Sequence, residues 1–334
     1  MKSVWNEGQG DGQSLALRGP SNIMRHFAVA PDSASEHAVI HLPDVLRPLS
    51  ADEICAHPKL PVALAGLSAQ LRQQYLQNPR LGRTLASHQR WLLSQATLAL
   101  HFEYDSTDKA SGLTVGRLRE LITVTSAASR NTVLNFMEEM RHYRYVQDVP
   151  HPEGARSRRR RIVVTDIATQ AIQSWLLANL AILDLLDGGS RAARLVEEPQ
   201  LVSVIQPLAA RACLADPRWV DPVDNVGLFQ WTEGGALAMD ELLIRCGQNP
   251  ADEEGRHSVG PINIRLLADQ FLMSHTHLQR LFRKAAEAGV VGWTGARRKA
   301  DLWVAASFLA EYRAWQSIKL AHVDAAYHQA IARG

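Results

Sequence analysis

Residues that could catalyse a reaction or bind a metal do not occur in this sequence at any recognisable spacing. The chain of 334 residues holds 13 histidines and three cysteines, yet it contains no HExxH, no G-x-S-x-G, no P-loop and no spaced Cys/His pair. His275 and His277 lie two positions apart, which places them on different faces of a helix and argues against a metal pair. The glycine-rich stretch at 8–12 has no apolar strand before it that would position a phosphate loop. We therefore expect no enzyme activity, no cofactor and no metal site.

A different kind of chemistry, hydrogen bonding to the edges of bases, fits a short polar run near residue 130. Arg pairs with O6 and N7 of guanine, and Asn pairs with N6 and N7 of adenine. A helix starting here would present such groups opposite its apolar stripe of Val133, Met137 and Met140. Ser129 suits the N-cap and a phosphate contact, whereas the apolar Leu134 suits either a thymine methyl or packing. The candidate DNA-binding residues of this helix are Ser129, Arg130, Asn131, Thr132 and Asn135.

Two more groups of polar and basic residues have the same character. A run of arginines follows the first helix, and on a strand alternate side chains point to opposite faces, so two or three of them could enter a minor groove or clamp phosphates. Its members are Arg156, Arg158, Arg159, Arg160 and Arg161. A second helix offers Thr276, His277, Gln279, Arg280 and Arg283. The alternatives are a solvated loop for the arginines and a protein contact for the second helix.

The elements around the first polar run follow a specific order. Apolar spacing predicts a long helix opened by Pro79, then a short extended segment at 113–115, and helices over 116–122 and 129–140. Strands are predicted over 143–146 and 158–165, with a Pro/Gly loop between them. This order is typical of a winged helix-turn-helix. A further helix at 166–187 is apolar almost all round in its later part, which predicts that another subunit or a neighbouring domain covers it.

The same plan is predicted a second time near the C-terminus. A helix over 236–246 and a polar loop over 249–261 precede a short segment at 262–264 that corresponds to 113–115. A helix from Ser274 ends at Gly289, residues 290–304 could form a short wing, and two amphipathic helices finish the chain. Features repeated in one order predict a mainly α fold with tandem winged helix-turn-helix domains and small β-wings, joined by a helical connector.

The named residues carry a resemblance to two families of transcription factors. Residues 81–187, with Ser129-Arg130-Asn131-Thr132-Val133 opening the recognition helix and the arginine-rich hairpin behind it, resemble a MarR-like winged-helix domain. The segment near 262–288, from Leu267-Ala268-Asp269-Gln270-Phe271 to His277-Leu278-Gln279-Arg280-Leu281-Phe282, is similar to one helix-turn-helix of AraC-type regulators. The resemblance implies a bacterial-type DNA-binding regulator.

Charge and composition divide the chain into regions. We expect a disordered tail at 1–36, a helical arm at 37–80, the first winged-helix domain with a dimerisation helix at 81–188, a connector at 189–233 and the second domain with C-terminal helices at 234–334. The net charge is only +2. However, residues 141–161 hold seven arginines against two carboxylates, and residues 280–299 hold six basic residues against one, so each window carries +5 and the rest of the chain −8. The near-neutral total therefore hides two basic patches.

The sequence also bears on location and partners. The best apolar run, at 175–186, falls short of the roughly 18 residues of a membrane span and contains Asn179 and Asp184. The scattered cysteines at 55, 213 and 246 favour a reducing compartment, so we expect a cytoplasmic, nucleoid-associated protein with no membrane partner.

The function predicted from these patterns is sequence-specific binding of double-stranded DNA by a transcriptional regulator. We expect a homodimer, because two-fold operators are frequent and the helix at 166–187 needs a cover. One alternative is a tandem winged-helix replication initiator, which binds repeated origin sequences as a monomer. The other is a scaffold that binds protein and not DNA. The operator, and whether a small-molecule effector is sensed, stay open.

Overall fold

The computed structural model describes residues 47–77, 86–108, 110–124, 127–149, 161–247, 249–295 and 301–333. The predicted tail at 1–36 lies outside these residues. The predicted arm contains two helices in its described part, α2 (Ala51–Ala56) and α3 (Leu60–Gln77). A capping box starts α2, where the Ser50 side chain accepts from the Glu53 amide and the Glu53 carboxylate accepts from the Ser50 amide. The chain is mainly helical, as the sequence predicted, and its strands are short.

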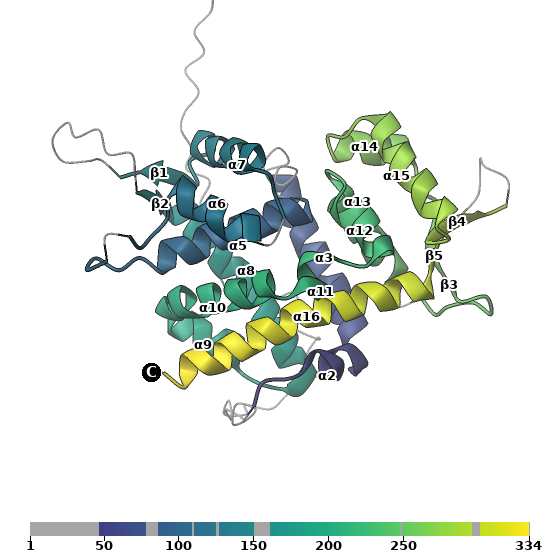
Figure 1. Ribbon diagram of the computed structural model, residues 1–334. Helices are drawn as coiled ribbons and strands as arrows, with labels where there is room; N and C mark the ends of the chain where they lie inside the picture. Colours follow the sequence, from purple (N-terminus) through teal and green to yellow (C-terminus); the bar gives the residue numbers. More distant parts are fainter. Residues whose placement is uncertain are drawn as a thin grey trace, which may run out of the picture. The chain divides into compact units, whose positions relative to one another are not determined.

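The first motif, defined here as the described residues from His88 to Val164, has the predicted order of elements (Figure 1). Its elements are α5 (His88–Phe102), α6 (Val115–Val124), α7 (Arg130–His142), β1 (Val146–Asp148) and β2 (Ile162–Val164). The strands β1 and β2 are antiparallel, and Leu113 forms an isolated bridge to Ile162. The predicted extended segment at 113–115 is thus a single bridge residue followed directly by α6.

Three boundaries of the first motif differ from the prediction. Ser87 caps α5, so this helix starts at His88, and the segment around Pro79 lies outside the described residues. The first strand starts at Val146 and not at 143, because Tyr143 caps α7 and Arg144 reverses the chain at a φ of 57°. The second strand, predicted over 158–165, spans Ile162–Val164 in the described residues, and positions 158–160 lie outside them.

The second motif, defined as the described residues from Gly235 to Ala305, repeats this order with a larger sheet. Its elements are α13 (Gly235–Cys246), β3 (Arg256–Gly260), α14 (Ile264–Gln270), α15 (His275–Glu287), β4 (Val291–Thr294) and β5 (Asp301–Ala305). The three strands are antiparallel in the order β3-β5-β4. In both motifs, therefore, the last strand pairs with the strand before it and with the chain that enters the second helix.

Two predictions for the second motif were wrong. The stretch 249–261, predicted as a polar loop, contains β3, and the true counterpart of Leu113 is this strand and not the segment 262–264. Instead of extending, Asn263 accepts hydrogen bonds from the amides of Arg265 and Leu266 and starts α14. The prediction that Gly289 ends the next helix was right, since α15 stops at Glu287 and Gly289 has a φ of 71°.

The region predicted as a connector is part of the core. It follows α8 (Asp166–Asp187) and consists of α9 (Arg191–Glu197), η1 (Pro199–Leu201), α10 (Val202–Ala215), α11 (Pro217–Val220) and α12 (Asp224–Gln230). Pro207 lies inside α10 and does not interrupt it. The chain finishes with one helix of 26 residues, α16 (Ala306–Ile331), and not with the two helices predicted (Figure 1).

The apolar helix α8 finds its cover within the chain. It packs against α3, α9, α10 and α16, and Leu176, Leu180, Ile182 and Leu183 are completely buried. Other helices of the same chain therefore cover the apolar surface of α8, and no second subunit is needed for this. The burial of α8 gives no support to a homodimer.

Packing also crosses the predicted domain boundaries at 188 and 233. The helix α3 lies against α13 of the second motif, and α16 lies against α2, α8 and α10. The described residues form one compact unit. None of the helices in the described part of the chain has the length and apolar content needed to cross a bilayer.

Candidate nucleic-acid interface

The helix α7 presents most of its predicted DNA-binding residues to solvent. The Ser129 side chain caps it as predicted, accepting a hydrogen bond from the Thr132 amide at 3.2 Å. The two hydroxyl groups of Ser129 and Thr132 lie 2.9 Å apart, so each is held by the other. Val133, Phe136, Met137 and Met140 are buried, and the opposite face exposes Asn131, Leu134, Asn135 and Glu138, while Arg130 is exposed at the first position of the helix.

Ion pairs hold α7 in place and neutralise the cations near it. Arg90 of α5 binds Glu139 through two bonds of 2.6 and 3.0 Å. Arg141 contacts Glu138 at 2.7 Å and Asp148 of β1 at 3.2 Å. Among the described residues, Arg130 is the cation of α7 that has no such carboxylate partner.

The hairpin of β1 and β2, which is the predicted wing of the first motif, is described only at its base. Four of the five predicted arginines lie outside the described residues: Arg156, Arg158, Arg159 and Arg160. Their contact with DNA stays a prediction. Arg161 is half-buried, and its guanidinium lies 4.0 Å from the ring centroid of Tyr104. Burial and the nearby Arg161 lower the pKa of His101, whose neutral Nδ1 accepts a hydrogen bond from the Val164 amide at 3.3 Å. Arg161 therefore packs on Tyr104 directly before β2, and His101 binds the last residue of that strand.

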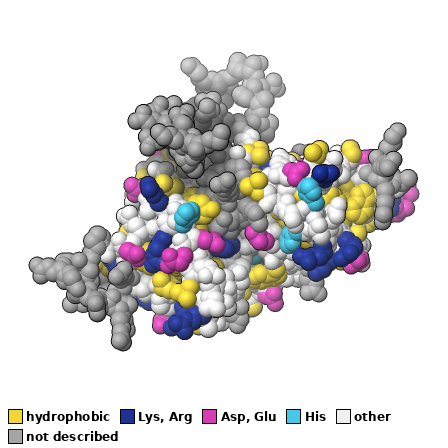
Figure 2. Space-filling model, turned by 90° about the horizontal axis from the view of Figure 1, so that it is seen from above, with side chains coloured by type: hydrophobic (Ala, Val, Ile, Leu, Met, Phe, Trp, Pro, Cys, Tyr) yellow, Lys and Arg dark blue, Asp and Glu magenta, His cyan; other side chains and the backbone are white. Residues whose placement is uncertain are grey.

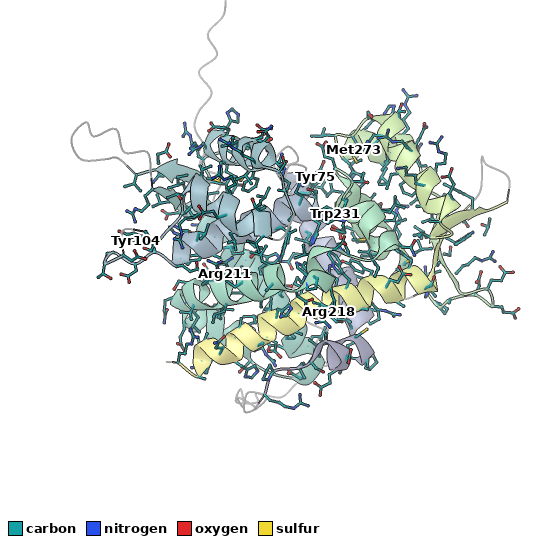
Figure 3. The ribbon with its side chains drawn as sticks, in the orientation of Figure 1. Tyr75, Tyr104, Arg211, Arg218, Trp231 and Met273 are labelled. Atoms are coloured by element: carbon teal, nitrogen blue, oxygen red, sulfur yellow. The ribbon has the colours of Figure 1, made fainter. Side chains whose placement is uncertain are left out.

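Tyr104 was missed by the sequence reasoning. It is labelled in Figure 3, and 43% of it is exposed beside Arg161. Gly112 makes room for it, because a Cβ there would meet the Tyr104 ring at 2.9 Å, and its φ of 85° also favours glycine. The sequence signal was weak, since only an aromatic residue in a polar loop marks this contact.

The helix α15 has the clearest division between an apolar and a basic face. Ser274 caps it by accepting from the His277 amide at 3.2 Å, and Leu278, Leu281, Phe282 and Ala285 are buried. The exposed stripe consists of Thr276, Gln279, Arg280, Arg283 and Lys284. All but Lys284 were predicted, and Lys284 follows Arg280 at the spacing of four residues that marks one helix face.

His277 lies at the side of this stripe and not within it. The residue is half-buried, and the Arg280 guanidinium donates to its Nδ1 at 3.2 Å. Its Nε2 atom is buried without a hydrogen-bond partner among the described residues. The structure therefore gives His277 a role in placing Arg280.

The turn between α14 and α15 is fixed by contacts from far away in the sequence. Tyr75 of α3, labelled in Figure 3, donates to the Gln270 carbonyl at 3.1 Å, and its ring meets Phe271 edge to face. The Arg72 guanidinium lies 4.4 Å from the centroid of the same Phe271 ring. His275 and Asp269 join the two helices through a contact of 2.6 Å. The His275–Asp269 pair is local, whereas the contacts of Tyr75 and Arg72 join residues about 200 positions apart and carry no local sequence signal.

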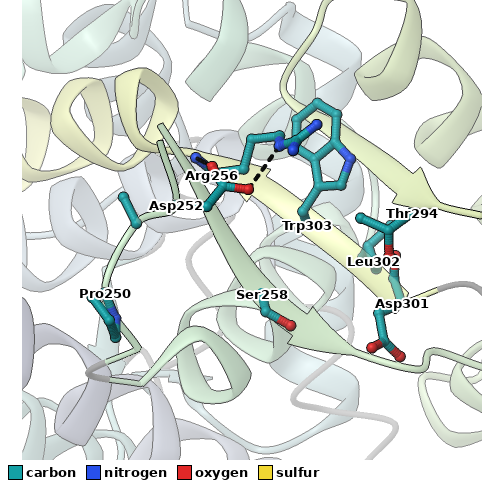
Figure 4. A pocket seen from close by; sticks show the side chains of 9 residues that line it. Pro250, Asp252, Arg256, Ser258, Thr294, Asp301, Leu302 and Trp303 are labelled. Carbon is teal, nitrogen blue, oxygen red and sulfur yellow. Dashed lines mark hydrogen bonds and ion pairs between the residues drawn. The ribbon is translucent and has the colours of Figure 1, made fainter. Parts of the chain in front are cut away.

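An open pocket of about 340 Å³ lies against the sheet of the second motif (Figure 4). Arg256 on its wall binds Asp252 at 3.0 Å and lies 5.5 Å from the Trp303 ring centroid, so these groups satisfy one another. In the described residues, no group of His, Cys, Asp and Glu side chains could hold a metal ion. The exposed faces of α7 and α15 therefore remain the main candidate site.

Comparison with known proteins does not assign the chain to a family. No family model, no curated protein sequence and no solved structure matches the chain. The resemblance of 81–187 to MarR-like domains and of 262–288 to AraC-type regulators accordingly stays a prediction.

Proposed function

We propose that the two motifs are winged helix-turn-helix modules and that the protein is a sequence-specific regulator that binds double-stranded DNA. The observation that carries this proposal is the exposed stripe of α15, where Thr276, Gln279, Arg280, Arg283 and Lys284 follow one helix face. Such side chains suit a recognition helix in a major groove, since Arg and Lys meet phosphates or guanine and Gln meets adenine. α7 occupies the same place in the repeated order of elements and exposes Arg130, Asn131 and Asn135. We place the protein in the cytoplasm, at the nucleoid.

The burial of α8 favours the second candidate, a replication initiator that binds repeated sites as a monomer. A homodimer was expected partly because α8 needed a cover, and that cover comes from α3, α9, α10 and α16 of the same chain. The mass of the complex on a selected duplex distinguishes the two. One chain per site favours the initiator, whereas two chains on a palindrome favour the regulator.

Both candidate functions require the binding of duplex DNA. Equilibrium binding to labelled duplexes at several salt concentrations tests this requirement. Duplexes are first selected from a random library, and affinity is then measured by fluorescence anisotropy between about 50 and about 200 mM salt, with an unselected duplex beside them. We expect the logarithm of the association constant to fall linearly, with a slope near −0.9 for each phosphate contacted. If the full-length protein binds no duplex in a salt-sensitive way, the proposal fails and the protein scaffold is favoured.

A further inference from the structure

The two candidate recognition helices differ in the charge that they expose. On α15, Arg280, Arg283 and Lys284 lie on one face, and the nearest carboxylate is that of Glu287, 3.7 Å from Arg283 with both side chains about two-thirds exposed. An exposed pair of this kind is worth little, so the face stays basic. Figure 2, seen from above Figure 1, shows Lys and Arg gathered on the side where α15 lies.

The face of α7 is mixed by contrast. Glu138 lies seven residues after Asn131 and 74% of its side chain is exposed, so a carboxylate occupies the same stripe as the candidate base contacts. Arg141 is bound to Glu138 and Asp148, and Arg90 is bound to Glu139. On the side of Figure 2 where α7 lies, positive and negative side chains alternate.

These differences have separate consequences on DNA. Affinity that depends on salt comes from cations that displace counterions from phosphates, and a carboxylate in the contact opposes it. Discrimination between bases comes from amides, guanidinium groups, carboxylates and apolar atoms at base edges. Asn131 and Asn135 suit adenine, Glu138 suits the amino group of cytosine, and Leu134, which is 41% exposed, suits a thymine methyl.

We infer that the two helices divide the task, α15 anchoring the protein to phosphates and α7 discriminating between sequences. This inference rests on the proposed function, because both roles require duplex DNA. The position of α7 is held by the two hydrogen bonds from Arg90 to Glu139, which leave Asn131 and Asn135 exposed. This arrangement agrees with a role in discriminating between bases. A rigid helix with few free cations can discriminate between base sequences without giving high affinity for every sequence.

Two matched alanine variants of the full chain test the division. The triple variant Arg280→Ala/Arg283→Ala/Lys284→Ala should lose affinity for selected and unselected duplexes alike, and its salt slope should shrink by about two to three units. The double variant Asn131→Ala/Asn135→Ala should keep the slope. Its preference for the selected duplex should fall about tenfold or more for each asparagine–adenine pairing that the substitutions remove. All five side chains are exposed, so circular dichroism should show unchanged folding.

A third variant separates charge from shape, since Arg280→Lys/Arg283→Lys should retain the salt slope of the wild type. The inference is overturned if the triple alanine variant keeps the wild-type slope, or if the α7 variant flattens it while leaving the preference intact. In either case the wild type still binds DNA, and the proposed function survives. Absence of salt-sensitive binding by the wild type overturns both.

Discussion

His88 is the most enclosed titratable residue of the first motif. The rings of Trp219, Trp231 and Trp315 each have their centroid 5.2 Å from the imidazole, and Trp91 stacks on it at 6.0 Å. Its Nε2 atom lies 2.9 Å from the Trp219 carbonyl. Burial lowers the pKa of His88 to about 4, so the imidazole is neutral in the folded protein at pH 7.

Acid should therefore destabilise the protein through this residue. In the unfolded chain His88 has its ordinary pKa of about 6.5, so below that pH the unfolded state takes up a proton that the folded state does not bind until about pH 4. The free energy of unfolding is fully retained above pH 6.5 and should fall by about 2 kcal/mol between pH 7 and pH 5. His88→Gln, which keeps a donor for the Trp219 carbonyl, should lose that part of the dependence. Urea titrations of both proteins at the two pH values measure the difference, and an equal acid loss in the variant would contradict the assignment.

The individual side chains of the candidate site were partly predictable. Once Val133, Met137 and Met140 are assigned to the core of α7, Asn131 and Asn135 must face away from it, whereas Arg130 shares the core side and is exposed as the first residue of the helix. The contacts of Tyr75 and Arg72 with Phe271 were not predictable, because about 200 residues separate the partners and no local pattern records them. His277 shows a further limit, since spacing placed it at the helix start but could not show that Arg280 binds it.

At the scale of elements, β4 depends on one glycine. Gly292 lies opposite Trp303 of β5, and a Cβ at this position would overlap the indole ring, its Nε1 atom being 2.9 Å away. The ring is half-buried, and the Arg256 guanidinium lies 5.5 Å from its centroid.

Gly292→Ala should therefore cost about 1–3 kcal/mol, as overpacking does in well-packed sites. The matched control is Gly116→Ala in α6, where the nearest atom to a new Cβ is Thr114 Oγ1 at 3.8 Å and alanine favours the helix. Thermal unfolding should show a lower melting temperature for the first variant and an equal or higher one for the second. A stable Gly292→Ala protein would mean that Trp303 moves freely.

Helices with caps and regular apolar spacing were predicted well, and other elements less so. Ser129 and Ser274 cap α7 and α15, and the buried residues recur every three or four positions. The strand β3 was missed because its five residues include a serine and end in glycine, and its pairing with β5 across the second motif stabilises it. Pro207 lies inside α10, where tertiary packing against α5 and α16 compensates for the missing hydrogen bond, and a local pattern does not record that packing.

At the scale of the whole described chain, the two motifs share their supporting helices. The helix α3 comes before the first motif in sequence and packs on α13 of the second, while α16 follows the second motif and packs on α8 and α10. A buried network joins the same helices, since Arg191 of α9 binds Asp187 of α8 at 2.6 Å and Asp324 of α16 at 2.7 Å. Arg191 and Asp324 are 1% and 0% exposed, so their charges are balanced inside the network and not by solvent. The predicted boundaries at 188 and 233 depended on composition. Composition cannot show that a helix from one region packs on the motif of another.

Because the two motifs share their supporting helices, we predict that the described residues between 47 and 333 unfold as one cooperative unit. Leu92 of α5 and Leu278 of α15 are both completely buried, one in each motif, so Leu92→Ala and Leu278→Ala form a matched pair that should each cost about 2–5 kcal/mol. Hydrogen exchange followed by mass spectrometry, under conditions where exchange reports global opening, compares peptides from α5 and α15 in each variant. We expect each substitution to speed exchange in both helices by the same factor, because one opening exposes both. If the motifs were independent domains, Leu278→Ala would accelerate α15 alone and leave α5 at the wild-type rate. That result would restore the two-domain division, and in the proposed function α7 and α15 would then engage DNA separately.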